Sequence, residues 1–223
     1  MKNKVFVISS LVVLFCIIMA IVDGVLKADY FAKSAIKLVL FLGFPAIYTL
    51  FNKEISLKPL FILKGKGILS AVLIGIGVYA VILGGYILLK DVFDFGNITG
   101  ALTKNIGVNG TNFIYVSIYI SFINSLLEEF FFRGFAFLTL KNISSRKFAY
   151  IFSAGVFALY HVAMMIGWFS APVFIIVMAG LFAGGLIFNY FNEKSGTVYP
   201  SWLIHMCANF AINTVGFILF GII

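Results

Sequence analysis

Residues 111–140, TNFIYVSIYISFINSLLEEFFFRGFAFLTL, form an apolar run in which the charged side chains are Glu128, Glu129 and Arg133. A membrane-spanning helix needs about 20 mostly apolar residues, and this run exceeds that length. The whole chain has the same character, since 62% of its 223 residues are hydrophobic and 11% are charged. In soluble globular domains, about 45–50% of residues are hydrophobic and about 25% are charged. A soluble fold could not bury so much apolar surface, and a disordered chain would be far more polar, so the sequence predicts an integral membrane protein.

Further apolar runs of similar length lie on both sides of this one. Together the runs are Val5–Val22, Ser34–Phe51, Gly67–Leu89, Thr111–Leu140, Phe148–Trp168, Ala171–Phe191 and Tyr199–Ile223. They predict an all-α fold, a polytopic transmembrane helical bundle of seven spans. The first run follows a basic start, as the apolar part of a signal peptide does. It is long for that, and Ala20-Ile-Val-Asp23 is a poor cleavage site, so we expect a retained helix.

The connections between the runs bear on the number of spans and domains. Because Thr111–Leu140 is overlong and Gly167–Pro172 is a tight connection, an eighth short or re-entrant piece is an open alternative to seven spans. The longest connection, Lys90–Gly110, is rich in Gly and Asn and is predicted to be a loop. The sequence shows no internal repeat and no separable soluble part, so residues 1–223 are predicted to form a single membrane domain.

Small and aromatic residues in the runs are predicted to serve packing. Gly180-xxx-Gly184 and the Gly84-Gly85 pair predict close approach between helices. The 27 Phe residues are predicted to be mainly lipid-facing bulk. For Phe130-Phe131-Phe132, beside the glutamates, the wall of a substrate groove is the alternative.

The cations in the connections predict the orientation of the chain, because cytoplasmic connections carry more Lys and Arg. With the N-terminus inside, the inner segments hold Lys2, Lys4, Lys53, Lys58, Lys64, Lys66, Lys141, Arg146, Lys147 and Lys194. The outer segments hold Lys27, Lys33, Lys37, Lys90 and Lys104. We therefore expect a multi-pass protein of the plasma membrane, in contact with membrane lipids, whose N-terminus is cytoplasmic. This distribution explains the net charge of +8 without a nucleic-acid partner.

Three charged residues interrupt the fourth run, and each would cost about 2.5–3.5 kcal/mol at the centre of a bilayer. Glu129 and Arg133 are four residues apart, so they share a helical face and can form an ion pair. Glu128 lies about 100° around the helix and has no such partner. A structural ion pair therefore accounts for Glu129 and Arg133 but leaves Glu128 unexplained.

Both histidines of the chain, His161 and His205, also lie inside apolar runs. A lone histidine in a span is ordinarily a hydrogen-bonding residue between helices, but here two histidines accompany an unpaired glutamate. His205 and Asn209 are four residues apart and share a face. Measured along their helices from the nearest cytoplasmic cation, Glu128, His161, His205 and Asn209 all lie roughly 16–23 Å deep. We predict that these four residues share one layer of the bundle.

This set of side chains is typical of water-dependent cleavage of a carbonyl compound. A buried carboxylate can act as general base, an imidazole can share the proton transfer, and further donors can stabilise an oxyanion. Other intramembrane chemistries fit less well. The sequence has no HExxH motif for a zinc protease, the Asp residues lie in connections, and Cys207 does not face His205 across one helix.

Three short motifs lie in order on successive apolar helices: Glu128-Glu129-xxx-Arg133, Phe157-xxx-His161 and His205-xxx-Asn209. They resemble the three motifs of the CPBP family, the CAAX proteases and bacteriocin-processing enzymes, also called Abi. The resemblance covers about residues 111–215, which would be the catalytic core, whereas the first spans match only as generic apolar helices. It implies an intramembrane endopeptidase active toward the cytoplasmic side, in which Glu129 and Arg133 hold the helix geometry.

The resemblance also implies roles for the remaining motif residues. Glu128 with His161 would activate the water, and His205 with Asn209 would form the oxyanion site. We expect no cofactor and no metal. If a metal is used, Glu128, His161 and His205 are acceptable zinc ligands.

The expected partner is a peptide or protein substrate. The Lys-, Ile-, Phe- and Asn-rich composition is typical of an AT-rich bacterium, where the family implies bacteriocin-like peptide processing or self-immunity. CAAX tail removal after prenylation is its eukaryotic role. A non-enzymatic immunity or scaffold protein that binds peptide with the same polar cluster is the alternative hypothesis. A proton-coupled transporter would also use buried Glu and His, but the sequence shows no inverted repeat that would support one.

Overall fold

The computed structural model describes residues 2–63, 65 and 67–223, and within them the chain is helical and contains no strand. Seven helical segments there are long and apolar enough to cross a membrane: Asn3–Leu26, Tyr30–Phe51, Ile68–Leu89, Phe113–Ile143, Arg146–Met165, Ala171–Ser195 and Tyr199–Leu219. The predicted all-α bundle of seven spans is confirmed. The long fourth segment is one continuous helical run, and the described residues hold no eighth segment of spanning length.

Several spans combine α-helix with short π-helical stretches. The first three are α1 (Lys2–Ile21) with π-helical η1 (Val22–Leu26); α2 (Tyr30–Leu38), π-helical η2 (Val39–Gly43) and α3 (Phe44–Phe51); and α4 (Ile68–Leu89), which follows the 3-10 helix η3 (Lys58–Phe61). The fourth is α6 (Phe113–Tyr119), π-helical η4 (Ile120–Asn124), α7 (Ser125–Glu128), π-helical η5 (Glu129–Leu138) and α8 (Thr139–Ile143). The last three are α9 (Arg146–Tyr160) with α10 (Val162–Met165), α11 (Ala171–Ser195) and α12 (Tyr199–Leu219).

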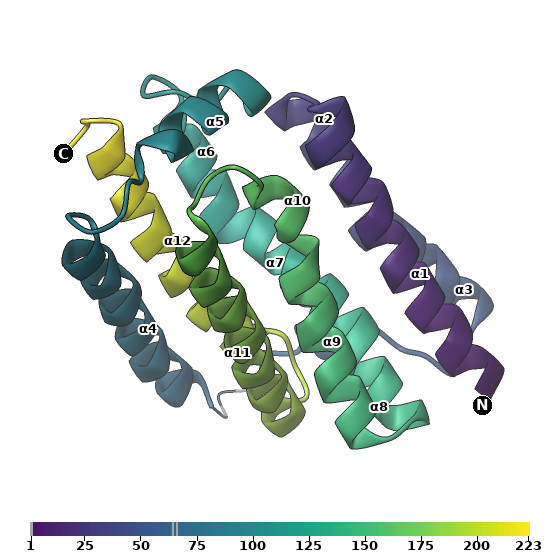
Figure 1. The fold of residues 1–223 in the computed structure, drawn as a ribbon. Coiled ribbons are helices and arrows are strands. Elements are labelled where there is room, and N and C mark those ends of the chain that lie inside the picture. Colours follow the sequence, from purple (N-terminus) through teal and green to yellow (C-terminus); the bar gives the residue numbers. More distant parts are fainter. Residues whose placement is uncertain (1, 64, 66) are drawn as a thin grey trace.

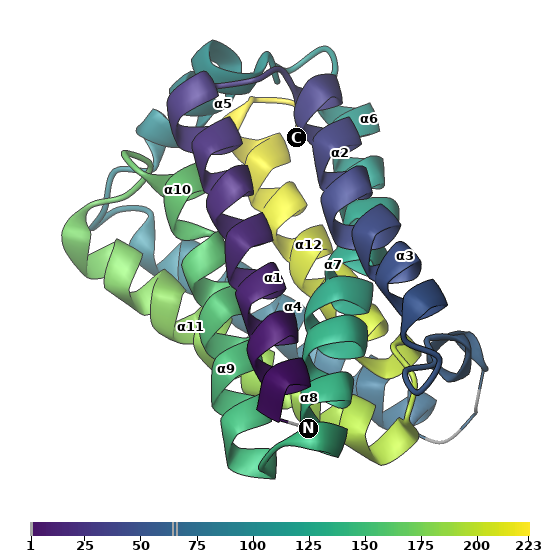
Figure 2. The same cartoon turned by 90° about the vertical axis from the view of Figure 1, so that its right-hand side faces the viewer.

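The fourth span lies inside the bundle, where η5 contacts α1, η2, α9 and α11. Helix α4 packs along α12 on the side of the bundle away from α1 (Figure 1). In the view turned by 90°, α1 lies beside the α2–α3 segment, and α12 is seen behind and between them (Figure 2). The fourth span thus meets protein on several sides, and η5 is buried continuously from Glu129 to Phe137.

This central position overturns the prediction of lipid-facing bulk for three phenylalanines. Phe130, Phe131 and Phe132 are at most 3% exposed. Phe131 stacks on Phe41 with ring centroids 4.0 Å apart. These rings are core, because η5 has neighbours around its circumference, which the apolar pattern of one helix does not reveal.

Two further predictions, one about a connection and one about helix packing, are wrong in detail. The connection Lys90–Gly110 is not simply a loop, since it contains α5 (Gly96–Ile106), which Gly107 ends in the left-handed conformation at φ +70°. The glycines predicted to pack closely, Gly180, Gly184, Gly84 and Gly85, have nothing within 4 Å of an added Cβ. Close approach occurs instead at Gly185, where such a Cβ would lie 3.0 Å from Ala154 Cα in α9.

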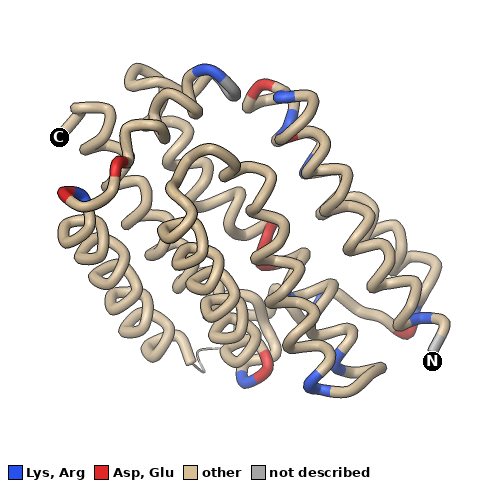
Figure 3. Tube along the Cα trace, viewed as in Figure 1, with Lys and Arg blue, Asp and Glu red and all other residues tan. Residues whose placement is uncertain are grey.

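Charged residues collect at the two ends of the bundle, and between these ends acidic residues lie on the α7–η5 run (Figure 3). At the end that holds the N-terminus, the Lys4 ammonium binds Glu54 at 2.5 Å and lowers the pKa of that exposed carboxyl. The predicted inner cations Lys64 and Lys66 lie outside the described residues.

Two cations assigned to outer connections lie inside the second span. Lys33 and Lys37 are on α2 and are only 8% and 6% exposed. Helix α2 begins early because the Asp29 side chain caps it, accepting the backbone N–H of Ala32 at 2.9 Å. Both lysines are therefore buried cations of a helical segment long enough to span a membrane, and each needs an acidic partner.

Candidate active site

Three ionisable side chains from three spans meet within the bundle. Glu128 ends α7, His161 follows the last residue of α9, and His205 lies in α12. The Oε2 atom of Glu128 lies 3.9 Å from His161 Nε2 and 3.8 Å from His205 Nε2. Glu128 is 3% exposed and His205 is 7% exposed. The structure therefore brings these three predicted residues together in a largely buried setting, with the His161 side chain 12% exposed.

The ring of His161 is oriented by its own helix. Its Nδ1 lies 2.8 Å from the carbonyl oxygen of Phe157, one turn earlier. Because a carbonyl oxygen only accepts, Nδ1 carries the proton and Nε2 presents a lone pair toward Glu128. The ring also meets the edges of Phe157 and Tyr160, with centroids 4.8 and 5.0 Å away. His161 is thus held as a proton acceptor.

The ring of His205 is oriented by Glu129. His205 Nδ1 lies 3.0 Å from Glu129 Oε1, while Glu129 Oε2 lies 3.5 Å from Arg133 Nε. The Arg133 guanidinium is fully buried, 4.0 Å from the ring centroid of Phe157 and 4.9 Å from that of Phe188. The ion pair predicted between Glu129 and Arg133 is present. Its carboxylate also fixes His205, a link across 76 residues that helical periodicity could not indicate.

Glu128 has partners that the sequence did not predict. Lys37 Nζ lies 2.5 Å from Glu128 Oε1, and Asn124 Nδ2 donates to the same oxygen at 3.0 Å. The expectation of an unpaired Glu128 is therefore wrong, because the partner lies on a different span. A lysine within the predicted span Ser34–Phe51 was the signal that would have found it.

Asn209 is tied to a π-helical stretch of the fourth span. Its Nδ2 donates to the carbonyl oxygen of Ile120 at 3.1 Å, at the start of η4. Short π-helical stretches are frequent at functional sites because they change which backbone groups are free. Asn209 is 8% exposed and lies one turn beyond His205 on α12. Its described hydrogen bond is to backbone, not to Glu128 or to either histidine.

Helix α12 starts inside the bundle, which corrects the predicted depth of His205. The connection 195–198 is largely buried, and the Val198 N–H donates to the Leu60 carbonyl of η3 at 3.1 Å. The depth predicted for His205 from Lys194 is too large, because the residues between α11 and α12 are not helical. From the start of α12 to His205 there is only about 9 Å of helix. His205 reaches the level of Glu128 because its helix begins deep in the bundle.

The donor geometry does not make a zinc site as it stands. Ligand atoms about 2.1 Å from a tetrahedral zinc lie about 3.4 Å apart, whereas the Glu128–histidine separations are 3.8 and 3.9 Å. Among the residues that the structure describes, no group of three or more His, Cys, Asp and Glu has an arrangement that could hold a metal ion. The Lys37 ammonium on the other carboxylate oxygen would also repel a cation placed beside Glu128.

Comparison with protein families gives one match to this part of the chain. Residues 110–211 match the model described as "Type II CAAX prenyl endopeptidase Rce1-like". No curated protein and no solved structure matches the chain. The matched residues include Glu128, His161, His205 and Asn209 but not Lys37. Over residues 110–211, the chain is similar to the Rce1-like proteins, which belong to the CPBP (Abi) family.

Proposed function

We propose that this chain is an intramembrane endopeptidase in which Glu128 and His161 activate a water molecule that attacks a peptide bond. The observation that carries the proposal is the meeting of Glu128 Oε2 with the two Nε2 atoms at 3.8 and 3.9 Å. A water about 2.8 Å from each of two such atoms bridges a separation of this size. The family match supports a CAAX-protease type of enzyme.

In the proposed reaction, Glu128 and His161 handle the proton of the water, and His205 and Asn209 stabilise the oxyanion. As the water oxygen bonds to the carbonyl carbon, its proton passes to Glu128, assisted by His161. The carbonyl oxygen becomes an oxyanion that accepts hydrogen bonds from a protonated His205 Nε2 and from the free N–H of Asn209. The proton then moves to the leaving nitrogen as the carbon–nitrogen bond breaks. The Glu129 carboxylate, 3.0 Å from His205 Nδ1, supports this role by holding the ring with Nε2 toward the site, as a carboxylate orients a histidine in other hydrolases.

The proposed substrate is a peptide that reaches the site from the cytoplasmic side. In a bacterium this would be a bacteriocin-like peptide, processed for export or destroyed for self-immunity. The description of the matching family adds a second class, a chain ending in a prenylated C-a-a-X sequence. Two quenched fluorescent peptides separate these classes: one with a Gly-Gly leader and one with a farnesylated C-a-a-X end.

The test measures cleavage of both peptides by the purified protein in lipid vesicles. We expect Glu128→Gln and His161→Ala to lower kcat on the cleaved peptide by about 10²–10⁴-fold, the usual contribution of general acid–base catalysis. Glu54→Gln, which removes an exposed carboxylate at one end of the bundle, is the matched control and should keep wild-type kcat. A Glu128→Gln variant that cleaves at the wild-type rate would overturn the mechanism. Protection of cells that survives in this variant would favour the non-enzymatic immunity alternative.

A further inference from the structure

Lys37 is a buried cation that binds the carboxylate of the site on the side away from the histidines. Its Nζ lies 2.5 Å from Glu128 Oε1 and 2.6 Å from Asn124 Oδ1. The ring centroids of Tyr160 and Phe41 lie 5.0 and 5.6 Å from the same nitrogen. Ammonium groups inside a membrane span are rare and face partners in the bundle interior. Here the partner is the proposed catalytic base.

The contacts of Lys37 fix how Glu128 is turned. Asn124 accepts from Lys37 and donates to Glu128 Oε1 at 3.0 Å, so the three polar groups form a closed triangle. Rotating the carboxylate about its Cγ–Cδ bond would break both hydrogen bonds to Oε1. With Oε1 occupied in this way, Oε2 is the oxygen that faces His161 and His205. The charge of Lys37 also offsets the charge of the buried carboxylate.

We propose that Lys37 is a positioning residue of this enzyme, which aims Glu128 Oε2 at the attacking water by holding Glu128 Oε1. The inference rests on the proposed function and deepens it. Lys37 touches neither the two Nε2 atoms nor the atoms that would react, so its effect passes through Glu128. Lys37 also lies outside the segment 110–211 that matches the family model. The second span therefore supplies a partner of Glu128 that the matched segment does not contain.

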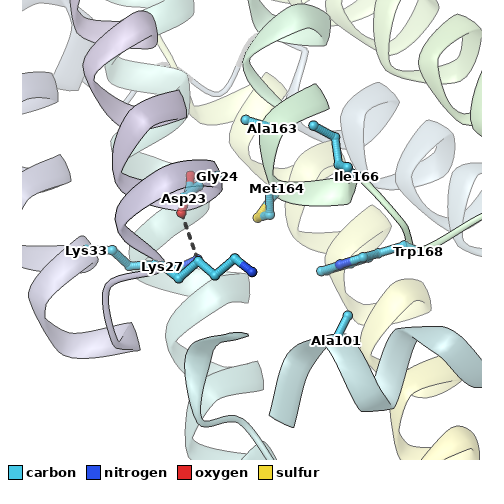
Figure 4. A pocket seen from close by; sticks show the side chains of 9 residues that line it. All are labelled: Asp23, Gly24, Lys27, Lys33, Ala101, Ala163, Met164, Ile166 and Trp168. Carbon is cyan, nitrogen blue, oxygen red and sulfur yellow. Dashed lines mark hydrogen bonds and ion pairs between the residues drawn. The ribbon is translucent and has the colours of Figure 1, made fainter. Parts of the chain in front are cut away.

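Lys33 provides a matched control on the same helix. It lies one turn before Lys37, is 8% exposed, and forms its own ion pair with Asp23 at 3.2 Å. Lys33 and Asp23 border a cavity of about 200 Å³ at one end of the bundle, where Lys27 reaches toward Trp168 (Figure 4). Removing Lys33 therefore disturbs a buried ion pair of the same kind without removing a partner of Glu128.

The test compares Lys37→Met with Lys33→Met, both purified and assayed on the probe peptide that the wild type cleaves. For Lys37→Met we expect kcat to fall about 100-fold, as when a catalytic group is misplaced. We expect KM to stay within about twofold, because Lys37 does not bind substrate. Lys33→Met should keep wild-type kcat while its thermal midpoint shifts as much as that of Lys37→Met. Asn124→Ala, which removes the second anchor of Oε1 at a half-buried position, should lower kcat about 10-fold at unchanged KM.

Each result decides the inference. A Lys37→Met variant with wild-type kcat, an equal loss in Lys33→Met, or a loss confined to KM would overturn it. If Lys37→Met does not fold, wild-type kcat in Asn124→Ala would overturn it as well. Glu128→Gln in the same assay keeps the two proposals apart. If Glu128→Gln is inactive and Lys37→Met is fully active, the positioning role fails alone, whereas an active Glu128→Gln means that the proposed function itself fails.

Discussion

The two oxygens of the Glu128 carboxylate serve different partners, and this bears on metal use. Oε1 is bound by Lys37 and Asn124, while Oε2 faces the two histidines at 3.8 and 3.9 Å. A divalent cation on Oε2 would lie close to the Lys37 ammonium in a medium of low dielectric constant, where like charges repel strongly. We therefore expect Glu128 Oε2 to bind a water molecule rather than zinc.

Metal removal tests this assignment. We expect 1,10-phenanthroline or EDTA to leave the rate of peptide cleavage within about twofold of the untreated rate, because water activation is assigned to protein groups. The measurement is cleavage of the probe peptide after chelation and dialysis, with a known zinc protease treated in parallel. Activity that is lost on chelation and restored by added zinc would assign Glu128, His161 and His205 to a metal instead.

The sequence indicates individual polar residues better than it indicates their connections. Glu128, His161 and His205 were predictable because ionisable groups inside apolar runs are costly and need a reason to be there. Lys37 was missed because it was counted among the cations of a connection, although it lies within a predicted span. The bond from Glu129 to His205 joins residues 76 positions apart, and no periodic pattern within one helix reports such a contact.

At the scale of elements, Gly185 determines how closely α11 approaches α9. A methyl group there would lie 3.0 Å from both Cα and Cβ of Ala154, whereas at the adjacent Gly184 it would meet nothing within 4 Å. We expect Gly185→Ala to destabilise the protein by about 1–3 kcal/mol, the usual range for overpacking. Gly184→Ala should cause no loss, since alanine is the better helix former. Thermal unfolding in detergent checks both, and equal midpoints for the two variants would contradict this packing.

The existence of the spans was predictable, but where each one begins and how it packs was not. Apolar length alone identifies seven spans. It does not show that α12 starts from a buried connection, because Val198 is buried against Leu60 of η3 and Phe130 of η5 rather than by its own helix. It also does not show the π-helical stretches η4 and η5. Helix α5 was missed because its short sequence contains two glycines and two asparagines, residue types that are typical of loops.

At the scale of the whole molecule, the first spans do more than enclose the family segment. Helix α2 contributes Lys37 to the site, and η2 contributes Phe41, which stacks on Phe131 of the fourth span. A segment limited to the predicted core 111–215 would therefore lack one partner of Glu128 and part of the aromatic packing around it. We infer that the second span and the family segment act as one functional unit.

The distribution of cations between the two ends of the bundle predicts its orientation in the membrane. The end with the N-terminus, which also holds the α8–α9 connection, carries the larger share of the cations and is expected to be cytoplasmic. Asn142→Cys in α8 and Asn97→Cys in α5 place exposed cysteines at opposite ends without changing the charge. With Cys16 and Cys207 replaced by Ala, a membrane-impermeant maleimide should label Asn97→Cys in intact cells and Asn142→Cys only after permeabilisation. The reverse pattern would place the N-terminus outside the cell. A cytoplasmic peptide would then reach Glu128 from the opposite end of the bundle.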